Sequence, residues 1–177
     1  MSQLKVDSIV PLNGLPSGAS GGGIIQIVST TKTDTFTTTA TSPTNVTGMA
    51  VTITPQSASH KILIVCQITG ASSSRYNAIR IARGSTPLAI GDADGSRTRA
   101  SFTTTTNPSA ASDTAVLKGM GMHWLDTPST TSATTYNLQA WIPYGSATLY
   151  LNQPADTTNA SYIIRGISTL TAIEVSV

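Results

Sequence analysis

The chain has 177 residues, of which only 10% are charged, and its formal net charge is +2. The 30 Thr and 22 Ser residues make up about 29% of the chain, so hydroxyl groups supply most of its polarity. One Glu and four Lys are too few to cover exposed helix faces, whereas Thr, Val and Ile suit strands, so the composition excludes an all-helical protein. The weak net charge and the scattered lysines also exclude a field that attracts nucleic acid, and no nucleic-acid partner is predicted.

The length suits a single domain. Cys66 is the one cysteine and cannot form an internal disulfide, and it stands in the apolar run at 62–66, so we interpret it as a small buried side chain rather than a reactive thiol. No apolar stretch reaches the ~18 residues of a membrane span, and the first five residues lack the order of a signal peptide. The sequence therefore predicts folding in a cytoplasm, without membrane insertion.

Residues 1–23 differ from the rest because proline and glycine recur through them and end in a glycine triplet at 21–23. This composition disfavours a continuous helix or a buried strand. The segment nevertheless carries more large aliphatic residues than a free linker would: Leu4, Val6, Ile9, Val10, Leu12 and Leu15. Either this N-terminal arm folds back on its own domain, or it anchors the chain to another subunit. We favour the anchor, because the glycines separate the arm from the body.

From residue 24 onward, apolar and polar residues alternate with a period of two, which is typical of strands with one buried face. The predicted strands, in chain order, are residues 24–28, 46–53, 61–69, 75–83, 114–125, 136–142, 148–151 and 166–177. Residues 61–69 are apolar at almost every position, as expected at the centre of a sheet. Residues 55–60 are predicted to form a turn between two of these strands.

Two further predictions concern the last third of the chain. A proline and a glycine at 143–145 separate two alternating segments, which predicts a hairpin that joins them. Near the C-terminus, Ile167, Ile173 and Val175 share one parity, so they are predicted to face the core from a strand tied into the sheet.

About eight to ten strands result from this interpretation. Several connections, at 91–96, 107–113 and 126–133, are long for hairpins, which favours two sheets whose strands cross between them. The sequence therefore predicts an all-β, jelly-roll-like β-sandwich over residues 24–177, with the extended N-terminal arm over residues 1–23.

The sequence offers little for catalysis or metal binding. The loop at 91–95 holds two Asp residues but lacks the further acidic ligands of a calcium loop. His123 and Asp126, three apart on a strand, would point to opposite faces. A zinc site would need nearly every Cys and His of the chain, and neither a nucleophile elbow nor a phosphate-binding loop occurs. No metal, cofactor or enzymatic activity is predicted.

Short motifs follow one another at particular spacings: VTITP at 51–55, KILIV at 61–65, Arg80 with RGSTP at 83–87, LDTP at 125–128, SATTY at 132–136, LYLN at 149–152 and STLTAIEV at 168–175. In this order they resemble the C-terminal head domains of tail fibres and related virion proteins of marine bacteriophages. The resemblance spans residues 24–177. The segment LKVDSIVP at 4–11 is similar to the N-termini of short structural proteins in such phages.

The resemblance implies a homotrimeric jelly-roll head, similar to the C1q and tumour-necrosis-factor fold, that works by binding and has no catalytic residues. Several strands are also apolar on both faces, which calls for a second apolar environment such as another copy. The expected location is the virion, after synthesis in the host cytoplasm, with the arm in contact with other virion proteins.

Two placements in the virion are compatible with the resemblance. The chain is either a short tail fibre whose receptor-binding head attaches to the host surface, or a capsid decoration or head-fibre protein docked on the capsid through its N-terminal arm. A head that binds a host glycan or protein is expected to do so through its loops. The predicted contact residues are Tyr144, Asn107, Ser129, Thr130 and Thr131.

Overall fold

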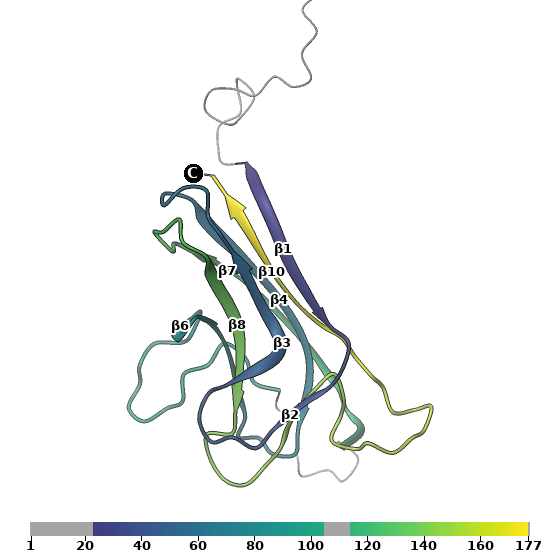
Figure 1. Ribbon diagram of the computed structural model, residues 1–177. Coiled ribbons are helices and arrows are strands. Elements are labelled where there is room, and N and C mark those ends of the chain that lie inside the picture. Colours follow the sequence, from purple (N-terminus) through teal and green to yellow (C-terminus); the bar gives the residue numbers. More distant parts are fainter. Residues whose placement is uncertain (1–22, 105–113, 177) are drawn as a thin grey trace, which may run out of the picture.

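The computed structural model describes residues 23–104 and 114–176, which are almost entirely strand and loop (Figure 1). The strands of this part are β1 (Ile24–Lys32), β2 (Phe36–Thr38), β3 (Thr44–Ile53), β4 (Lys61–Ser72), β5 (Ala78–Arg83), β6 (Thr86–Leu88), β7 (Lys118–Asp126), β8 (Thr134–Trp141), β9 (Leu149–Leu151) and β10 (Ser168–Val175). Within the described residues, no helix is long and apolar enough to cross a membrane.

The strands form two antiparallel sheets, which Figure 1 shows packed face to face. Sheet A has the order β1-β10-β4-β9-β2, and β7 pairs with the opposite edge of β4. Sheet B has the order β3-β8-β5-β6. Strand β4 is therefore the centre of sheet A, paired along both edges, as its apolar run predicts.

Two positions in sheet A are each filled by two strands, one following the other along the same line. Strands β10 and β9 pair in succession with residues 61–67 and 70–72 of β4, and β1 and β2 pair with β10 and β9. The sandwich thus has four strand positions in each sheet, and the chain crosses between the sheets after β2, β3, β4, β6, β7 and β8. This is a jelly-roll pattern, and it confirms the predicted all-β, jelly-roll-like sandwich.

The core lies between the sheets and consists of the inward side chains of both. Strand β4 contributes Ile62, Ile64 and Ile68, and β8 contributes Leu138, all fully buried. Cys66 lies in the same row of β4, and burial raises the pKa of its thiol to about 12. The interpretation of Cys66 as a small buried side chain is confirmed.

The predicted turn at 55–60 lies between β3 and β4, but the hairpin predicted around residues 143–145 is wrong. Strand β8 belongs to sheet B and β9 to sheet A, so residues 142–148 cross from one sheet to the other. The physical reason is that each strand finds a better partner elsewhere, since β8 pairs with β3 and β5, and β9 extends the pairing along β4.

The C-terminal strand β10 is tied into sheet A between β1 and β4, but its predicted core face is wrong. Leu170, Ala172 and Glu174 point inward and are fully buried. The residues predicted to face the core lie on the outer side instead: Ile167, Ile173 and Val175. Alternation defines two faces of a strand, and register with β4 decides which of them is inside.

The sandwich has two ends. At the entry end the chain enters β1, and the backbone N–H of Ser176 donates to the carbonyl of Gly23 (2.9 Å). The connections 54–60 and 127–133 also lie at this end (Figure 1). At the distal end lie the connections 39–43, 73–77 and 142–148. The predicted anchor lies outside the described residues: Leu4, Val6, Ile9, Val10 and Leu12.

Candidate functional site

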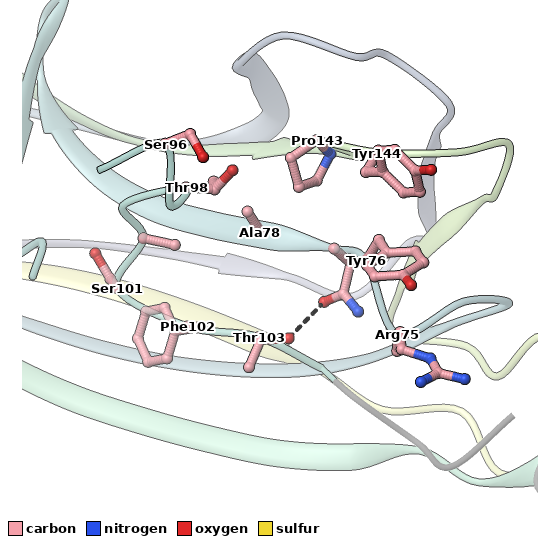
Figure 2. A pocket seen from close by; sticks show the side chains of 12 residues that line it. Arg75, Tyr76, Ala78, Ser96, Thr98, Ser101, Phe102, Thr103, Pro143 and Tyr144 are labelled. Carbon is pink, nitrogen blue, oxygen red and sulfur yellow. Dashed lines mark hydrogen bonds between the residues drawn. The ribbon is translucent and has the colours of Figure 1, made fainter. Parts of the chain in front are cut away.

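An open pocket lies at the distal end of the sandwich (Figure 2). Its volume is about 550 Å³, which falls within the ~300–1,000 Å³ of small-molecule sites. It is lined by Arg75, Tyr76, Asn77, Ala78, Ser96, Thr98, Ala100, Ser101, Phe102, Thr103, Pro143 and Tyr144. These residues come from three segments that are far apart in the sequence.

Hydrogen bonds fix two of the three walls to each other. The buried side-chain oxygen of Asn77 accepts from the backbone N–H of Thr104 (2.7 Å) and from its hydroxyl (3.0 Å). The backbone N–H of Ile79 on β5 donates to the carbonyl of Phe102 (3.1 Å), and the two residues form an isolated β-bridge. The segment around Phe102 therefore continues the edge of sheet B beyond β6.

The third wall, residues 142–148, is held at both of its ends. The backbone N–H of Ile142 donates to the carbonyl of Ala40 (2.7 Å), and the backbone N–H of Thr148 donates to the hydroxyl of Ser73 (2.9 Å). Between these anchors Gly145 has φ +76°, a left-handed conformation that glycine adopts without strain. Hydrogen bonds to two other segments therefore fix the position of this wall.

Two aromatic rings dominate the mouth of the pocket. Tyr76 and Tyr144 pack edge to face, with their ring centroids 5.1 Å apart and an angle of 79° between planes. They are 43% and 70% exposed. In an edge-to-face pair, one ring contacts the other only through its edge, so neither face of that ring is covered by its partner. The mouth therefore presents an aromatic surface to the solvent.

Arg75 is the one charged side chain among the described residues that line the pocket. Its guanidinium carbon lies 5.8 Å from the ring centroid of Tyr76, a cation–π distance. No Asp or Glu lines the pocket in the described part of the chain. The pocket thus combines one positive charge, aromatic surface and hydroxyl groups.

The predicted contact residues do not form a single site. Tyr144 lies at the distal end and lines the pocket, whereas Ser129, Thr130 and Thr131 lie in the connection 127–133 at the entry end. The two sets sit at opposite ends because β8, which lies between them in the chain, runs the length of the sandwich. Asn107 lies outside the described residues.

The sequence interpretation missed Arg75, Tyr76 and the wall around Phe102. The sequence offered one signal for Arg75 and Tyr76, because these residues come soon after the apolar run that forms the central strand. In the structure, Ser72 at the end of β4 pairs with Leu149 at the start of β9. The residues just after β4 therefore lie next to the residues just before β9. Periodicity within each segment carries no information about that pairing.

Two charged clusters lie at the entry end, and both are structural. The side chain of Glu174 is fully buried; its carboxylate accepts from the side-chain amide of Gln26 (2.5 Å) and the backbone N–H of Gln56 (2.7 Å), and lies 2.6 Å from Nδ1 of His60. Burial raises the pKa of this carboxyl, but the bonds outweigh it and hold the pKa below its usual value.

The second cluster joins the two sheets. One carboxylate oxygen of Asp126 accepts from the hydroxyl of Tyr136 (2.7 Å) and from the guanidinium of Arg83 (2.8 Å). Burial and the bond to Asp126 raise the pKa of Tyr136. His123 is exposed on the other face of β7, so the prediction that it cannot pair with Asp126 is confirmed.

A second candidate surface is the outer face of sheet A. Ile27, Ile173, Leu63 and Leu125 are neighbours in register on β1, β10, β4 and β7, and form one aliphatic row across the sheet. We call these four residues the outer row. Ile27 is 56% exposed and Leu125 48% exposed. Further aliphatic residues flank the row: Ile24, Val65 and Val175.

No protein-family model and no curated protein matches the sequence. Among solved structures, the chain is similar to one in the infectious bursal disease virus VP2 subviral particle, with 14% identity and a TM-score of 0.40. It is also similar to one in the structure of the infectious bursal disease virus Gx strain, with 15% identity and a TM-score of 0.37. Each match covers 94% of this chain and 44% of the viral chain, so this chain spans less than half the length of those proteins.

Proposed function

We propose that this chain is a phage virion structural protein that works by binding: a short trimeric head that attaches to the host surface through the distal pocket. The resemblance to phage fibre heads supports the virion role, and the jelly-roll-like fold agrees with it. The observation that carries the binding role is the pocket itself, which has an aromatic mouth and walls fixed by hydrogen bonds. Nothing in this function requires a catalytic group.

The positions of the pocket and the arm agree with attachment at one end and recognition at the other. Gly23 is tied to Ser176 at the entry end, where residues 1–22 join the body. The tyrosines at the pocket mouth lie in the connections 73–77 and 142–148, which are at the distal end. A particle that holds the arm would therefore present the pocket outward, which is the arrangement that an attachment protein needs.

Copies of this chain are the proposed partners for the outer face of sheet A. About four strands ~4.8 Å apart and about nine residues long at ~3.4 Å per residue have a footprint of roughly 600 Å². This footprint is of the same order as the ~800 Å² that each partner buries in a standard interface. In a three-fold assembly, each contact joins two different surfaces of the chain. The outer row supplies an apolar surface at each edge of sheet A, one at Ile27 and one at Leu125.

Light scattering on the purified protein tests the assembly. A trimer has a mass of about 55 kDa, three times the 18.3 kDa of the chain. A mass near 18.3 kDa at micromolar concentration contradicts the trimer. A mass near twice that value replaces it with a two-fold dimer, in which the same surface meets itself.

Deletion of residues 1–20 tests the arm. Because residues 21–23 are all glycine, the deletion is expected to leave thermal unfolding nearly unchanged and to abolish incorporation into virions. Loss of the cooperative unfolding transition would show instead that the arm belongs to the domain core.

Labelled protein on intact virions then separates the two placements. Label at the tail tip, together with adsorption of the purified trimer to host cells, supports the attachment role. Label over the capsid surface without adsorption supports the alternative, a capsid decoration or head-fibre protein docked through the arm. Catalytic turnover of a host polymer by the purified protein would contradict both.

A further inference from the structure

We infer that the distal pocket binds a sugar that carries a carboxylate, such as a uronic acid unit of a surface polysaccharide. This inference rests on the proposed role of the pocket as the host-binding site and names the chemistry of its ligand. It follows from three features that occur together in the pocket: an aromatic mouth, the guanidinium of Arg75, and the hydroxyls of Ser96 and Thr98, which make no hydrogen bond to a described residue.

The aromatic mouth favours a sugar ring. One face of a pyranose carries C–H groups, which pack on an aromatic ring, while its hydroxyls remain free for hydrogen bonds. Tyr144 is 70% exposed and Tyr76 43% exposed, so ring surface is available at the mouth. The edge-to-face contact between the two rings fixes their relative angle, so little side-chain freedom is lost when a ligand packs there.

The guanidinium of Arg75 favours a ligand with a negative charge. Arg75 is exposed and makes no ion pair with a described residue, while Asp94, the acidic residue nearest in sequence to the wall at 96–103, is paired with Arg97 (2.6 Å). Arginine and a carboxylate form two parallel hydrogen bonds, which gives the contact a preferred orientation. The Arg75 guanidinium lies 5.8 Å from the ring centroid of Tyr76, so a ligand that contacts this ring lies beside the positive charge. The positive pocket disfavours cationic ligands and favours anionic ones.

The remaining wall supplies hydrogen bonds of the kind that sugars use. The hydroxyls of Ser96 and Thr98 line the pocket and have no hydrogen-bond partner among the described residues. Hydroxyls donate and accept, which matches the hydroxyl groups of a pyranose. The volume of about 550 Å³ leaves room for one or two sugar units.

The test compares three probes that share one ring: glucuronic acid, its methyl ester and glucose. Titrations of the full-length protein are followed by NMR at constant ionic strength. Glucuronate is expected to bind at least tenfold more tightly than either neutral probe, and the difference is expected to shrink as salt rises. Equal affinity for the three probes overturns the inference, and so does the absence of binding by any of them at millimolar concentration.

Variants assign the contacts. Arg75→Gln is expected to reduce glucuronate affinity to that of glucose and to leave glucose unchanged. Tyr144→Ala is expected to weaken all three probes, and Tyr144→Phe to retain most of the affinity. Arg165→Gln removes an exposed cation that does not line the pocket, and serves as the matched control. If Arg165→Gln and Arg75→Gln have equal effects, the attraction is general and the inference is wrong.

Failure of the ligand class and failure of the proposed function give different results. If the pocket binds the host through another ligand, trimer adsorption to host cells persists in excess glucuronate and is lost in Tyr144→Ala. If the protein does not attach to the host at all, adsorption is absent, while glucuronate binding to the pocket remains measurable.

Discussion

The outer faces of the two sheets differ in chemistry although the sheets share one core. On sheet B, Thr52 and Thr135 exchange a hydrogen bond between hydroxyls (2.8 Å), and Arg80 donates to Gln139 (2.8 Å). None of the exposed large apolar side chains of the described residues lies on β3, β5, β6 or β8. Sheet A instead carries the outer row. The outward side chains Gln139 and Trp141 of sheet B are buried within the chain itself. Sheet A, by contrast, exposes an aliphatic patch at the outer row, which is unfavourable in water.

This difference explains the burial pattern of β10. Its inward residues are Ser168, Leu170, Ala172 and Glu174, a set of modest apolar content. Its outward residues include Ile173, a member of the outer row. The strand therefore carries a large aliphatic side chain on each face: Leu170 lies in the core and Ile173 on the outer side.

The largest expected effect comes from removing β10. A chain truncated after Ser161 lacks the strand between β1 and β4, so β1 loses its partner and the core loses Leu170 and Ala172. The lost backbone ladder and burial exceed the ~5–15 kcal/mol by which a domain is stable. We expect no cooperative unfolding transition by circular dichroism. A soluble, cooperatively folded product would contradict the central place of β10 in sheet A.

The second prediction tests the comparison between the sheets directly. Ile27→Asp combined with Leu125→Asp places charges on the outer row, and is expected to convert the oligomer to monomer with little change in secondary structure. Each buried large aliphatic contributes roughly 1.5–3 kcal/mol, so loss of both weakens association at least a hundredfold.

Thr52→Asp, on the outer face of sheet B, is the matched control and is expected to leave the mass unchanged in analytical ultracentrifugation. If both sets of substitutions leave the oligomer intact, the outer face of sheet A is not the interface. If Thr52→Asp alone dissociates the oligomer, the interface lies on the outer face of sheet B.

The third prediction concerns the seam in sheet A where β9 and β10 meet. Asn152 is fully buried, has φ +60°, and donates to the carbonyls of Lys32 (2.8 Å) and Asp34 (2.9 Å). Its side-chain oxygen accepts from the hydroxyls of Thr69 (3.0 Å) and Ser168 (2.7 Å). The side chain thereby holds both ends of residues 152–168 and the break between β1 and β2.

Asn152→Ala removes these four bonds and places a less tolerant residue in a left-handed conformation. We expect a loss of about 2–4 kcal/mol in the free energy of unfolding, measured by urea denaturation. Asn159→Ala, at an exposed position of the same excursion, is the control and is expected to cost under ~0.5 kcal/mol. Equal costs would show that the seam does not depend on Asn152.

The smallest expected effect is that of Glu174, the inward charge of β10. The pKa of its carboxyl lies below the usual ~4.3 in the folded protein. The ionised form therefore stabilises the fold above about pH 4.3, and this contribution is lost as the pH falls through the folded pKa. We expect Glu174→Gln to lower stability by about 1–2 kcal/mol at pH 7.

Thermal melts between pH 7 and pH 3 measure this contribution, and the gap between Glu174→Gln and the parent protein is expected to close toward pH 3. Asp92→Asn, at an exposed position, is the control and is expected to follow the parent at every pH. A gap that stays constant over the whole range would assign the effect to packing rather than to charge.

The sequence by itself determined the fold class and most of the strands. The scarcity of Lys and Glu, the abundance of Thr and the alternation with a period of two leave no stable alternative to an all-β protein. Position 61–69 as the sheet centre also followed from the sequence, because a strand that is apolar at nearly every position needs cover on both faces. The burial of Cys66 followed from the same run.

Only the tertiary structure decided which apolar face is inside, which strands pair and which loops share an end. Ile173 and Leu170 are equally suited to a core, and the register of β10 on β4 puts Leu170 inside and Ile173 in the outer row. Pairing between β4 and β9 brings Arg75 and Tyr76 to Tyr144, while the length of β8 keeps residues 129–131 at the opposite end. Local periodicity records the two faces of each strand, whereas pairing and crossing depend on contacts between residues far apart in the chain, which no local pattern encodes.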